Sequence, residues 1–269
     1  MVTVNLLGLG FDDMNVPETV NRLLSRDPQA PFAYVVTPNA DHIARLRRLP
    51  ALEPVYENAW LRLFDSRLLS NLARLWRVPA PRVAAGVDVT ALLLSSLTSQ
   101  DVAIIGFSAE HLPALRRLCP DTNFILHKPP MKLLENPQAF LAARDFVVRT
   151  NAQFTFIGLG SPLQELLAQA IASHPDAKGI GLCIGSALEL CTGVKRRAPL
   201  WMQHAGFEWF HRLVHEPRRL SRRYLVDDPP VVFALLGEAL KNLGRLGTSR
   251  TSGRNGHSGR RLSGGRIER

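Results

Sequence analysis

Short apolar runs alternate with helix-type patterns along the first 194 residues of this chain, and no other feature restricts its fold as strongly. The apolar runs lie at residues 34–36, 61–64, 102–106, 124–126, 154–158 and 180–184, and each is typical of a buried strand. Helical spacing occupies residues 40–48, 67–75, 89–97, 109–118, 133–148 and 163–173. A further strand and turn are expected within residues 1–16, ahead of a helix near residues 18–25. This alternation builds βαβ units, so we predict an α/β fold: a Rossmann-like, largely parallel sheet with helices on both faces.

Positive charge is confined to the C-terminal part of the chain. Residues 1–194 contain 17 Lys and Arg against 17 Asp and Glu, whereas residues 195–269 contain 16 against 6, which accounts for the whole net charge of +10. In a nucleic-acid-binding protein, the globular part is usually basic as well. Residues 1–194 have no net charge, so we expect no nucleic-acid partner. We divide the chain into an α/β core (1–194), a helical appendage (195–246) and a Gly/Ser/Arg-rich tail (247–269) that is expected to be disordered.

The segment from residue 196 to residue 224 interleaves Trp and Phe residues with seven arginines. On a single helix, Met202, Ala205, Trp209, Phe210, Leu213 and Val214 would share an apolar arc, opposite His204, Glu208, His211, Arg212 and His215. Pro217 would end this amphipathic, basic helix, and Arg218, Arg219, Arg222 and Arg223 follow it. Such a segment suits membrane headgroups or a diphosphate ligand. The histidines lack the HExxH arrangement of a zinc site, and we expect no metal.

The remaining global features favour a cytoplasmic protein that lies on a membrane. No apolar stretch reaches the length of about 18 residues that spanning requires, and no signal peptide is recognisable at the N-terminus. Cys119, Cys183 and Cys191 are odd in number and lack CxxC spacing, which fits a reducing compartment. We therefore expect a peripheral protein on the inner face of the cell membrane.

Polar residues and glycines follow three of the predicted strands. Ligands bind at the carboxyl ends of strands in such sheets, where Thr37-Pro38-Asn39, Asp65-Ser66 and Gly158-Leu159-Gly160-Ser161-Pro162 lie. Each block also has a structural interpretation, because Thr37, Asn39 or Asp65 could cap the next helix and the glycine turn could simply join a strand to a helix. The turn is no dinucleotide fingerprint, since Leu163 stands where the third glycine of GxGxxG belongs, and no Walker pattern occurs.

Taken in chain order, these blocks and a C-terminal one resemble a known family. They are TPNADHI (37–43), Asp65, Gly86-Val87-Asp88, GLGSPLQE (158–165) and the block from Arg197 to Tyr224, which contains EW, RL, EPRR and RRY. Over about residues 1–235 the chain resembles the WecG/TagA/CpsF glycosyltransferase family. The resemblance implies an inverting transferase that moves an N-acetylmannosamine-type sugar, its uronic acid, or glucose from UDP to a lipid-linked acceptor. It also implies a Rossmann-like core with a C-terminal appendage that contacts the membrane and helps to close the site.

Three positions depart from the family pattern. Ser66 stands where the family usually has Gly, Leu163 where it often has Lys, and Glu189 where many members have Asp. None of the three removes a residue expected to be catalytic. They leave the donor sugar open, because the neighbouring loops shape its pocket.

An inverting transfer requires a base for the acceptor and groups that stabilise the diphosphate. A base must take the proton of the acceptor hydroxyl while UDP leaves from the opposite face, and a carboxylate is ionised at neutral pH. Asp65 is the predicted base, because it ends its strand and matches the family's base; Asp88 and Glu165 are the alternatives. No Asp-x-Asp triplet is present to hold a metal, so we expect no cofactor and assign the diphosphate to helix N-terminal amides and arginines. The predicted substrate-binding residues are Thr37, Asn39, Asp88, Gly158, Gly160, Gln164, Glu165, Arg212, Arg219 and Arg222.

Two functions of different class follow from the sequence. The first is a peripheral-membrane glycosyltransferase of cell-surface or exopolysaccharide biosynthesis. Its partners would be a UDP-sugar, a polyprenyl-diphosphate-linked saccharide acceptor and an anionic membrane surface. The second is a non-catalytic α/β protein that binds a nucleotide or a phospholipid and docks through its basic C-terminal segment. The sequence leaves a homo-oligomer open.

Overall fold

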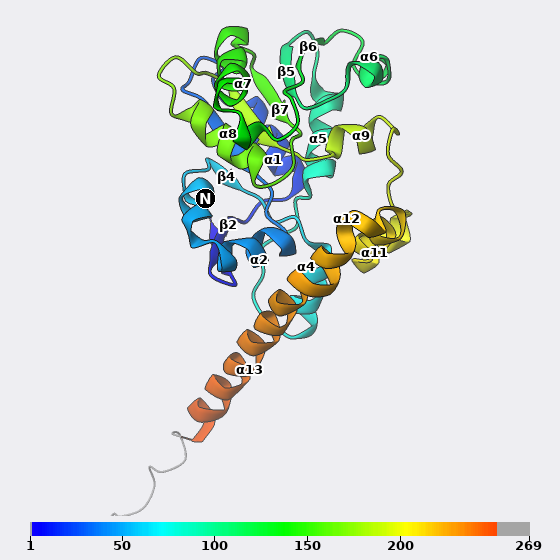
Figure 1. Cartoon of the computed structure of the whole chain (residues 1–269). Coiled ribbons are helices and arrows are strands. Elements are labelled where there is room, and N and C mark those ends of the chain that lie inside the picture. The colour runs from blue at the N-terminus through cyan, green and yellow to red at the C-terminus, as the bar shows by residue number, and fades with distance from the viewer. Residues whose placement is uncertain (1, 252–269) are drawn as a thin grey trace, which may run out of the picture.

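The computed structural model describes residues 2–251, with side chains described as far as residue 242. Within this part of the chain, the central sheet has six strands in the order β4-β3-β8-β7-β5-β6 (Figure 1). The strands are β3 (Ala33–Val36), β4 (Leu61–Arg62), β5 (Asp101–Ile105), β6 (Asn123–His127), β7 (Phe154–Ile157) and β8 (Ile180–Cys183). All neighbouring strands run parallel. The predicted α/β fold with a parallel sheet is therefore confirmed, and every predicted apolar run overlaps one of these strands.

Helices cover both faces of the sheet. They are α1 (Val16–Leu24), α2 (Ala40–Arg48), α3 (Glu53–Glu57), α4 (Arg67–Leu75), α5 (Gly86–Ser96), α6 (Leu112–Leu118), α7 (Pro137–Thr150), α8 (Leu163–Ala172) and α9 (Ala187–Cys191). One buried apolar cluster joins the sheet to α1, α5, α6 and α9, and a second joins its other face to α3, α7 and α8. Along β3, Val35 belongs to the first cluster, whereas Tyr34 and Val36 belong to the second. This period of two is what a strand buried on both faces requires.

The N-terminal residues differ from the expected single strand and turn. They form an antiparallel hairpin of β1 (Thr3–Leu6) and β2 (Leu9–Asp12), which lies outside the central sheet. Leu7 and Gly8 make the turn with φ of 58° and 91°, and the left-handed region is where two-residue hairpin turns place both central residues. Asn5 Oδ1 accepts the Gly8 N–H at 3.2 Å and so stabilises this turn.

The C-terminal segment is not the one amphipathic helix that its arcs suggested. It forms α10 (Leu200–Ala205), α11 (Glu208–His215), α12 (Pro217–Arg222), a π-helical turn (Arg223–Asp227) and the long helix α13 (Pro229–Thr251). The first break falls at Gly206, whose φ is 81° and where a Cβ would lie 3.0 Å from Leu68 Cα. Only glycine fits this left-handed position against α4. Pro217 separates α11 from α12, as its missing N–H predicts.

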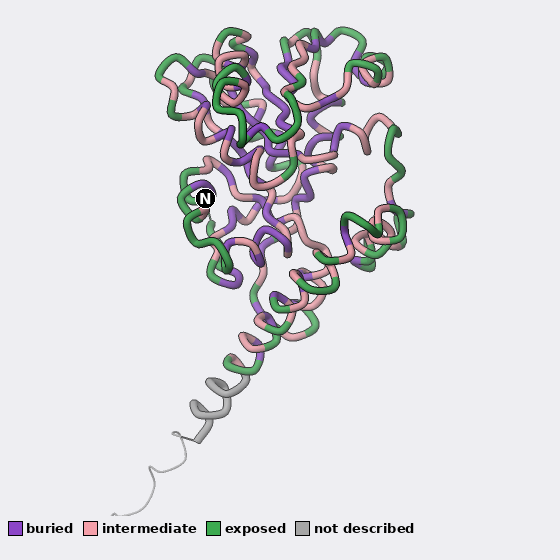
Figure 2. Tube along the Cα trace, viewed as in Figure 1, coloured by how far each residue is buried: buried purple, intermediate pink, exposed green. Residues whose placement is uncertain are grey.

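Helix α13 packs back onto the core before it projects away from it (Figure 1). Val231 and Leu235 are fully buried in a third apolar cluster together with residues of the hairpin, α2 and α4, and with Phe64 from the loop after β4. In Figure 2 the part of the helix next to the core accordingly alternates between buried, intermediate and exposed residues. Residues 247–251 belong to α13, although the tail was expected to begin there, and residues 252–269 lie outside the described part of the chain. In the described residues, no helix combines the length and apolar character needed to cross a bilayer.

Candidate functional site

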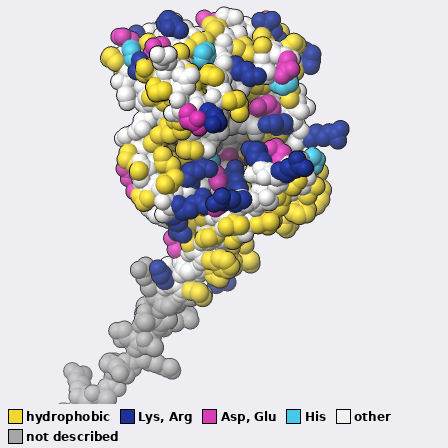
Figure 3. Space-filling model, in the orientation of Figure 1, with side chains coloured by type: hydrophobic (Ala, Val, Ile, Leu, Met, Phe, Trp, Pro, Cys, Tyr) yellow, Lys and Arg dark blue, Asp and Glu magenta, His cyan; other side chains and the backbone are white. Residues whose placement is uncertain are grey.

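A cavity of about 860 Å³ lies at the carboxyl ends of β3, β4, β7 and β8 and is closed on its other side by residues 206–233. Figure 3 shows the corresponding hollow bordered by Lys and Arg side chains. The predicted site residues that line the cavity are Thr37, Asn39, Asp65, Gly158, Gly160, Gln164, Arg212, Arg219 and Arg222. Asp88 and Glu165 do not line it. Segments more than a hundred residues apart in the chain thus meet where the sequence placed them, at the carboxyl edge of the sheet.

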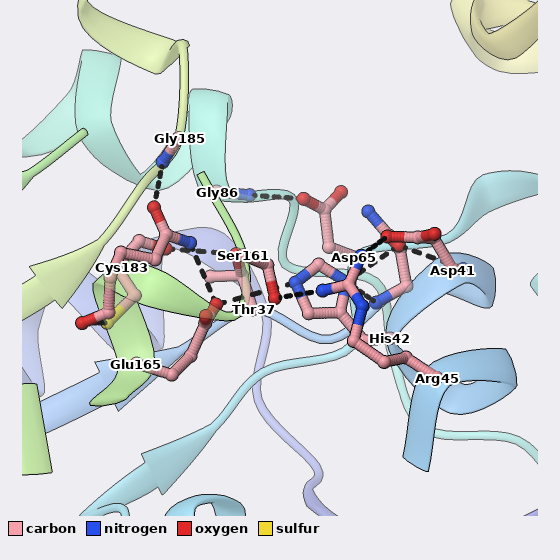
Figure 4. Close-up of polar contacts among 12 residues, drawn as sticks. Thr37, Asp41, His42, Arg45, Asp65, Gly86, Ser161, Glu165, Cys183 and Gly185 are labelled. Atoms are coloured by element: carbon pink, nitrogen blue, oxygen red, sulfur yellow. Dashed lines mark hydrogen bonds and ion pairs between the residues drawn. The ribbon is translucent and has the colours of Figure 1, made fainter. Parts of the chain in front are cut away.

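Asp65 follows β4 at the cavity wall. Its backbone N–H donates to Pro38 O at 3.0 Å, and its Oδ2 accepts the Gly86 N–H at 3.2 Å (Figure 4). Burial raises the pKa of the Asp65 carboxyl to about 6; the Gly86 bond and His42 oppose this shift, while Glu208 and Asp88 add to it. Asp65 does not cap α4. The cap is the next residue, Ser66, whose Oγ accepts the Leu69 N–H at 3.3 Å. Asp65 is therefore left available for chemistry.

Asp88 belongs to an ion-pair network rather than to the cavity. Its two oxygens accept from Arg67 Nη2 at 2.5 Å and from Arg197 Nη1 at 2.7 Å. The same two guanidinium groups lie 3.4 and 3.5 Å from Glu208, on α11. These four side chains, hereafter the Arg67 network, connect α4 and α5 to the C-terminal segment. With both oxygens engaged, Asp88 is a poor candidate for the base.

Asn39 is at once a helix cap and a cavity residue. It is the N-cap of α2, and its Oδ1 accepts the Asp41 N–H at 3.1 Å. The capping interpretation therefore holds for Asn39, but it does not exclude a role in binding, because the residue also lines the cavity. Thr37 caps nothing: its hydroxyl donates to Cys183 O at 3.4 Å across the β3–β8 pair.

Gln164 and Glu165 form a buried pair at the start of α8. Gln164 Oε1 accepts the Gly185 N–H at 2.9 Å, and its Nε2 donates to Glu165 Oε1 at 2.8 Å. Burial of Glu165 opposes its ionisation, but hydrogen bonds from His42 and Gln164 outweigh it, and the pKa of Glu165 is lowered. Both ends of the Gln164 amide are thus engaged within the protein. The residue shapes the cavity by holding the loop after β8.

The two predicted glycines fill different needs. A Cβ on Gly158 would lie 2.9 Å from Gly185 O, so glycine is required for close packing of adjacent strand ends. Gly160 has a φ of 76°, and a Cβ there would meet nothing within 4 Å. Its backbone therefore borders open space in the cavity, where a ligand can approach the main chain.

Several cations line the cavity, but most are paired. Arg223 lies 3.5 Å from Asp41, Arg219 lies 2.5 Å from Glu216, and Arg48 pairs with Asp227. Among the described residues, Arg212 and Arg222 line the cavity without an ion-pair partner within 4.0 Å. These two arginines are consequently the cations most available to an anionic ligand.

Sequence reasoning assigned no role to three polar residues of the site: His42, Arg45 and Asp228. Arg223, which the sequence placed in the arginine cluster suited to a diphosphate, also lines the cavity. His42 Nε2 lies 3.5 Å from Glu165 Oε1, and Arg45 Nη1 donates to Ser161 Oγ at 2.5 Å. The available signal was the helical spacing from Asn39, which turns positions 42 and 45 to the same side of α2. Asp228 gave no such signal. It is buried at the cavity wall, and this burial raises its pKa to about 6.

We searched the described residues for side chains that could bind a metal ion. The described residues contain no group of three or more His, Cys, Asp and Glu side chains arranged to hold an ion. His211 and His215 lie with ring centroids 4.1 Å apart, and His215 Nδ1 contacts His211 O at 2.8 Å. The expectation of a metal-independent site remains a prediction.

Comparison with known families bears on this geometry. The family model described as "Glycosyl transferase WecG/TagA/CpsF family" matches residues 4–245, which is most of the chain. The chain belongs to this family. Its members are glycosyltransferases of cell-surface polysaccharide biosynthesis, so a sugar donor and an acceptor are its substrates.

The three departures from the family pattern can be placed in this site. Ser66 supplies the cap of α4, which Gly at that position could not. Leu163 packs against the cluster between the sheet and α8. Glu189 lines the cavity, and its Oε1 lies 3.9 Å from Lys195 Nζ. Of the three, Ser66 and Glu189 line the cavity, whereas Leu163 does not.

Proposed function

We propose that this glycosyltransferase transfers a sugar from UDP to a lipid-linked acceptor with inversion, and that Asp65 is the general base. The observation that carries the proposal is the Asp65 carboxyl, which lines the cavity, accepts a single backbone N–H and has its pKa raised to about 6. A pKa near the operating pH combines an ionised carboxylate with useful basicity.

The reaction has a simple balance at this site. The acceptor hydroxyl gives its proton to the Asp65 carboxylate, and its oxygen forms a bond to the anomeric carbon. The bond from that carbon to the phosphate oxygen of UDP breaks on the opposite face, and UDP carries the charge away. Arg212, Arg222 and backbone N–H groups around Gly160 line the cavity and would stabilise this charge.

The acceptor and the membrane are assigned to the C-terminal segment. Among the large hydrophobic side chains that are exposed in the described residues, ten of 18 lie between residues 200 and 240, including Trp201, Phe207 and Phe233. Figure 3 shows hydrophobic side chains gathered beside the hollow, over the C-terminal helices. An apolar surface next to cationic side chains suits an anionic bilayer, so we place the enzyme on the inner face of the cell membrane.

A transfer assay tests the function directly. A panel of UDP-sugars is incubated with a polyprenyl-diphosphate-linked saccharide and excess chelator, using the full chain and the Asp65→Asn variant. We expect transfer from one donor by the wild type, a severe loss in the variant, and unchanged UDP binding by calorimetry in both. Activity that disappears in chelator and returns with magnesium or manganese would show that a metal holds the diphosphate.

The non-catalytic alternative gives a different result in the same assay. It requires that no donor in the panel is consumed, although UDP or phospholipid vesicles still bind. That outcome would overturn the proposed transfer and leave a nucleotide- or phospholipid-binding protein.

A further inference from the structure

The Asn39 side chain is held through its oxygen alone. Three groups converge on Asn39 Oδ1: the Asp41 N–H at 3.1 Å, Arg223 Nη2 at 3.3 Å and His42 Nδ1 at 2.8 Å. Exchanging the amide oxygen and nitrogen would place an NH2 group against the first two, which can only donate. The contacts therefore fix the orientation of the amide. Its Nδ2 makes no hydrogen bond to the described residues, and Asn39 lines the cavity.

His42 connects Asn39 to a buried carboxylate. Its Nδ1 contacts Asn39, while its Nε2 lies 3.5 Å from Glu165 Oε1. Figure 4 shows His42 and Glu165 in this region. Glu165 is 1% exposed, and its Oε2 has no hydrogen-bond partner among the described residues. A buried carboxylate of this kind needs a compensating charge. Within the described part of the chain, His42 is its ion-pair partner.

One contact opposes a proton on His42 Nδ1. The backbone N–H of Asn39 lies 3.3 Å from His42 Nδ1. A hydrogen bond between them would complete a capping box, but Nδ1 can accept it only through an unprotonated lone pair. With that lone pair, Nδ1 and Asn39 Oδ1 would face each other at 2.8 Å without a proton between them. The shorter contact decides, because losing one long hydrogen bond costs less than opposing two acceptors at this distance.

We propose that Glu165 and His42 are positioning residues: the Glu165 carboxylate holds a doubly protonated His42 ring, and the ring holds Asn39 so that its NH2 group donates to an oxygen of the sugar nucleotide. A helix cap needs only Oδ1, so the cap leaves this NH2 group free for a ligand. The assignment rests on the proposed function, since a sugar nucleotide must occupy the cavity.

The protonation of the ring is tested without any activity. Nitrogen-15 NMR of the full chain at pH 7 reports which ring nitrogens carry protons. We expect both His42 nitrogens to be protonated in the wild type, and one proton to be lost in Glu165→Gln, which keeps the shape of the side chain and removes its charge. A neutral wild-type ring with an unprotonated Nδ1 would overturn the relay, whether or not the chain transfers sugar.

The role of the NH2 group is tested with Asn39→Ser. Serine also caps helices well, so the cap is kept while the amide donor is lost. We expect kcat/KM for the donor to fall roughly 10-fold with little change in Tm, the size of one hydrogen bond to a polar ligand. The matched control is Asn136→Ser, because Asn136 caps α7 in the same way and does not line the cavity. Unchanged kcat/KM in Asn39→Ser would refute the donor role.

A double-mutant cycle tests the connection itself. If Glu165 acts through Asn39, the double variant Asn39→Ser/Glu165→Gln should lose no more kcat/KM than the more damaged single variant. Losses that multiply would show that the two residues act independently and would overturn the relay. A wild type that transfers no UDP-sugar at all would instead refute the proposed function, and the NMR result would still decide the protonation of His42.

Discussion

At the level of single residues, three neighbouring carboxylates have different surroundings. Asp88 and Glu208 are each paired with both Arg67 and Arg197, whereas Asp65 accepts one backbone N–H and is partly buried. The pairing engages the first two carboxylates in ion pairs, whereas burial raises the pKa of Asp65. Such a difference in surroundings separates carboxylates with a structural role from one that can act in catalysis.

The pKa of Asp65 predicts how transfer depends on pH. A base works when it is ionised, so kcat/KM should fall as the pH decreases through about 6. Asp65→Asn should lower turnover by roughly 10²- to 10⁴-fold and abolish this acidic limb. Measuring kcat/KM between pH 5 and 8 checks both, and a variant with near-normal turnover would show that Asp65 is not the base.

The same carboxyl should affect stability with a defined sign. Its pKa is higher in the folded chain than the ordinary 3.8, so the folded state binds the proton more tightly. Stability is therefore lost as the pH rises from about 4 to 6, and Asp65→Asn should be more stable than the wild type at pH 7 but not at pH 3. Thermal unfolding at the two pH values measures this, and an Asp65→Asn variant that is less stable at pH 7 would contradict it.

The unpaired arginines of the cavity should bind the donor diphosphate. A hydrogen bond to a charged group contributes about 1.5–3 kcal/mol, so Arg212→Ala or Arg222→Ala should reduce kcat/KM roughly 10- to 100-fold. Arg218 is exposed on the same segment and does not line the cavity, so Arg218→Ala is the matched control. Equal losses in all three variants would point to a general effect of charge.

At the level of elements, the Arg67 network attaches the C-terminal segment to the core. Its side chains are 23–25% exposed, so their charges are partly shielded from water. Arg48 with Asp227 and Arg223 with Asp41 add contacts from the π-helical turn to α2. The wall of the cavity that carries Arg212 and Arg222 is thus held in place by ion pairs as well as by packing.

Breaking the Arg67 network should loosen this wall. Glu208→Gln leaves two guanidinium groups with one carboxylate, and we expect a loss of about 1.5–3 kcal/mol in unfolding free energy. The control is Glu216→Gln, because Glu216 pairs with the exposed Arg219 and such surface pairs contribute less than about 1 kcal/mol. Denaturant titration compares the two, and equal losses would show that the network has no special role.

At the level of the whole molecule, helix α13 of the appendage shares an apolar cluster with the core. Leu235 of α13 is fully buried against the same cluster as Phe11 and Phe64. A chain cut before Lys195 would expose that cluster, so we expect it to lose stability as well as transfer. Outward, the same segment presents the apolar surface assigned to the membrane.

Membrane binding should therefore depend on exposed aromatics that contribute little to stability. Trp201 and Phe207 are 65% and 47% exposed, and burying such a side chain in the bilayer interface contributes about 1.5–3 kcal/mol. Trp201→Ala or Phe207→Ala should weaken liposome flotation roughly 10-fold or more, with Tm unchanged. Met131→Ala is the control, because Met131 is 92% exposed and far from this segment in the chain. Equal flotation of all variants would place the membrane contact elsewhere.

The sequence by itself determined the elements of the core and the edge at which the site lies. Each strand of the sheet overlaps an apolar run, because burial on both faces leaves little choice of side chain. Asp65, Thr37 and Gly160 could be placed at one edge since parallel strands present their carboxyl ends together. The apolar arcs of residues 202–214, by contrast, predicted one helix, because a periodicity cannot register the left-handed turn that packing against α4 imposes at Gly206.

Only the tertiary structure decided which polar groups meet. Asn39 and Arg223 are 184 positions apart, and their contact exists because α13 packs onto α2 and brings the preceding turn to the cavity. The buried Glu165 was predicted at the site but lies behind it, where it faces His42 instead of a ligand. Local patterns report propensity and burial, whereas the partner of a buried charge depends on how distant segments close around it, and no local pattern contains that information.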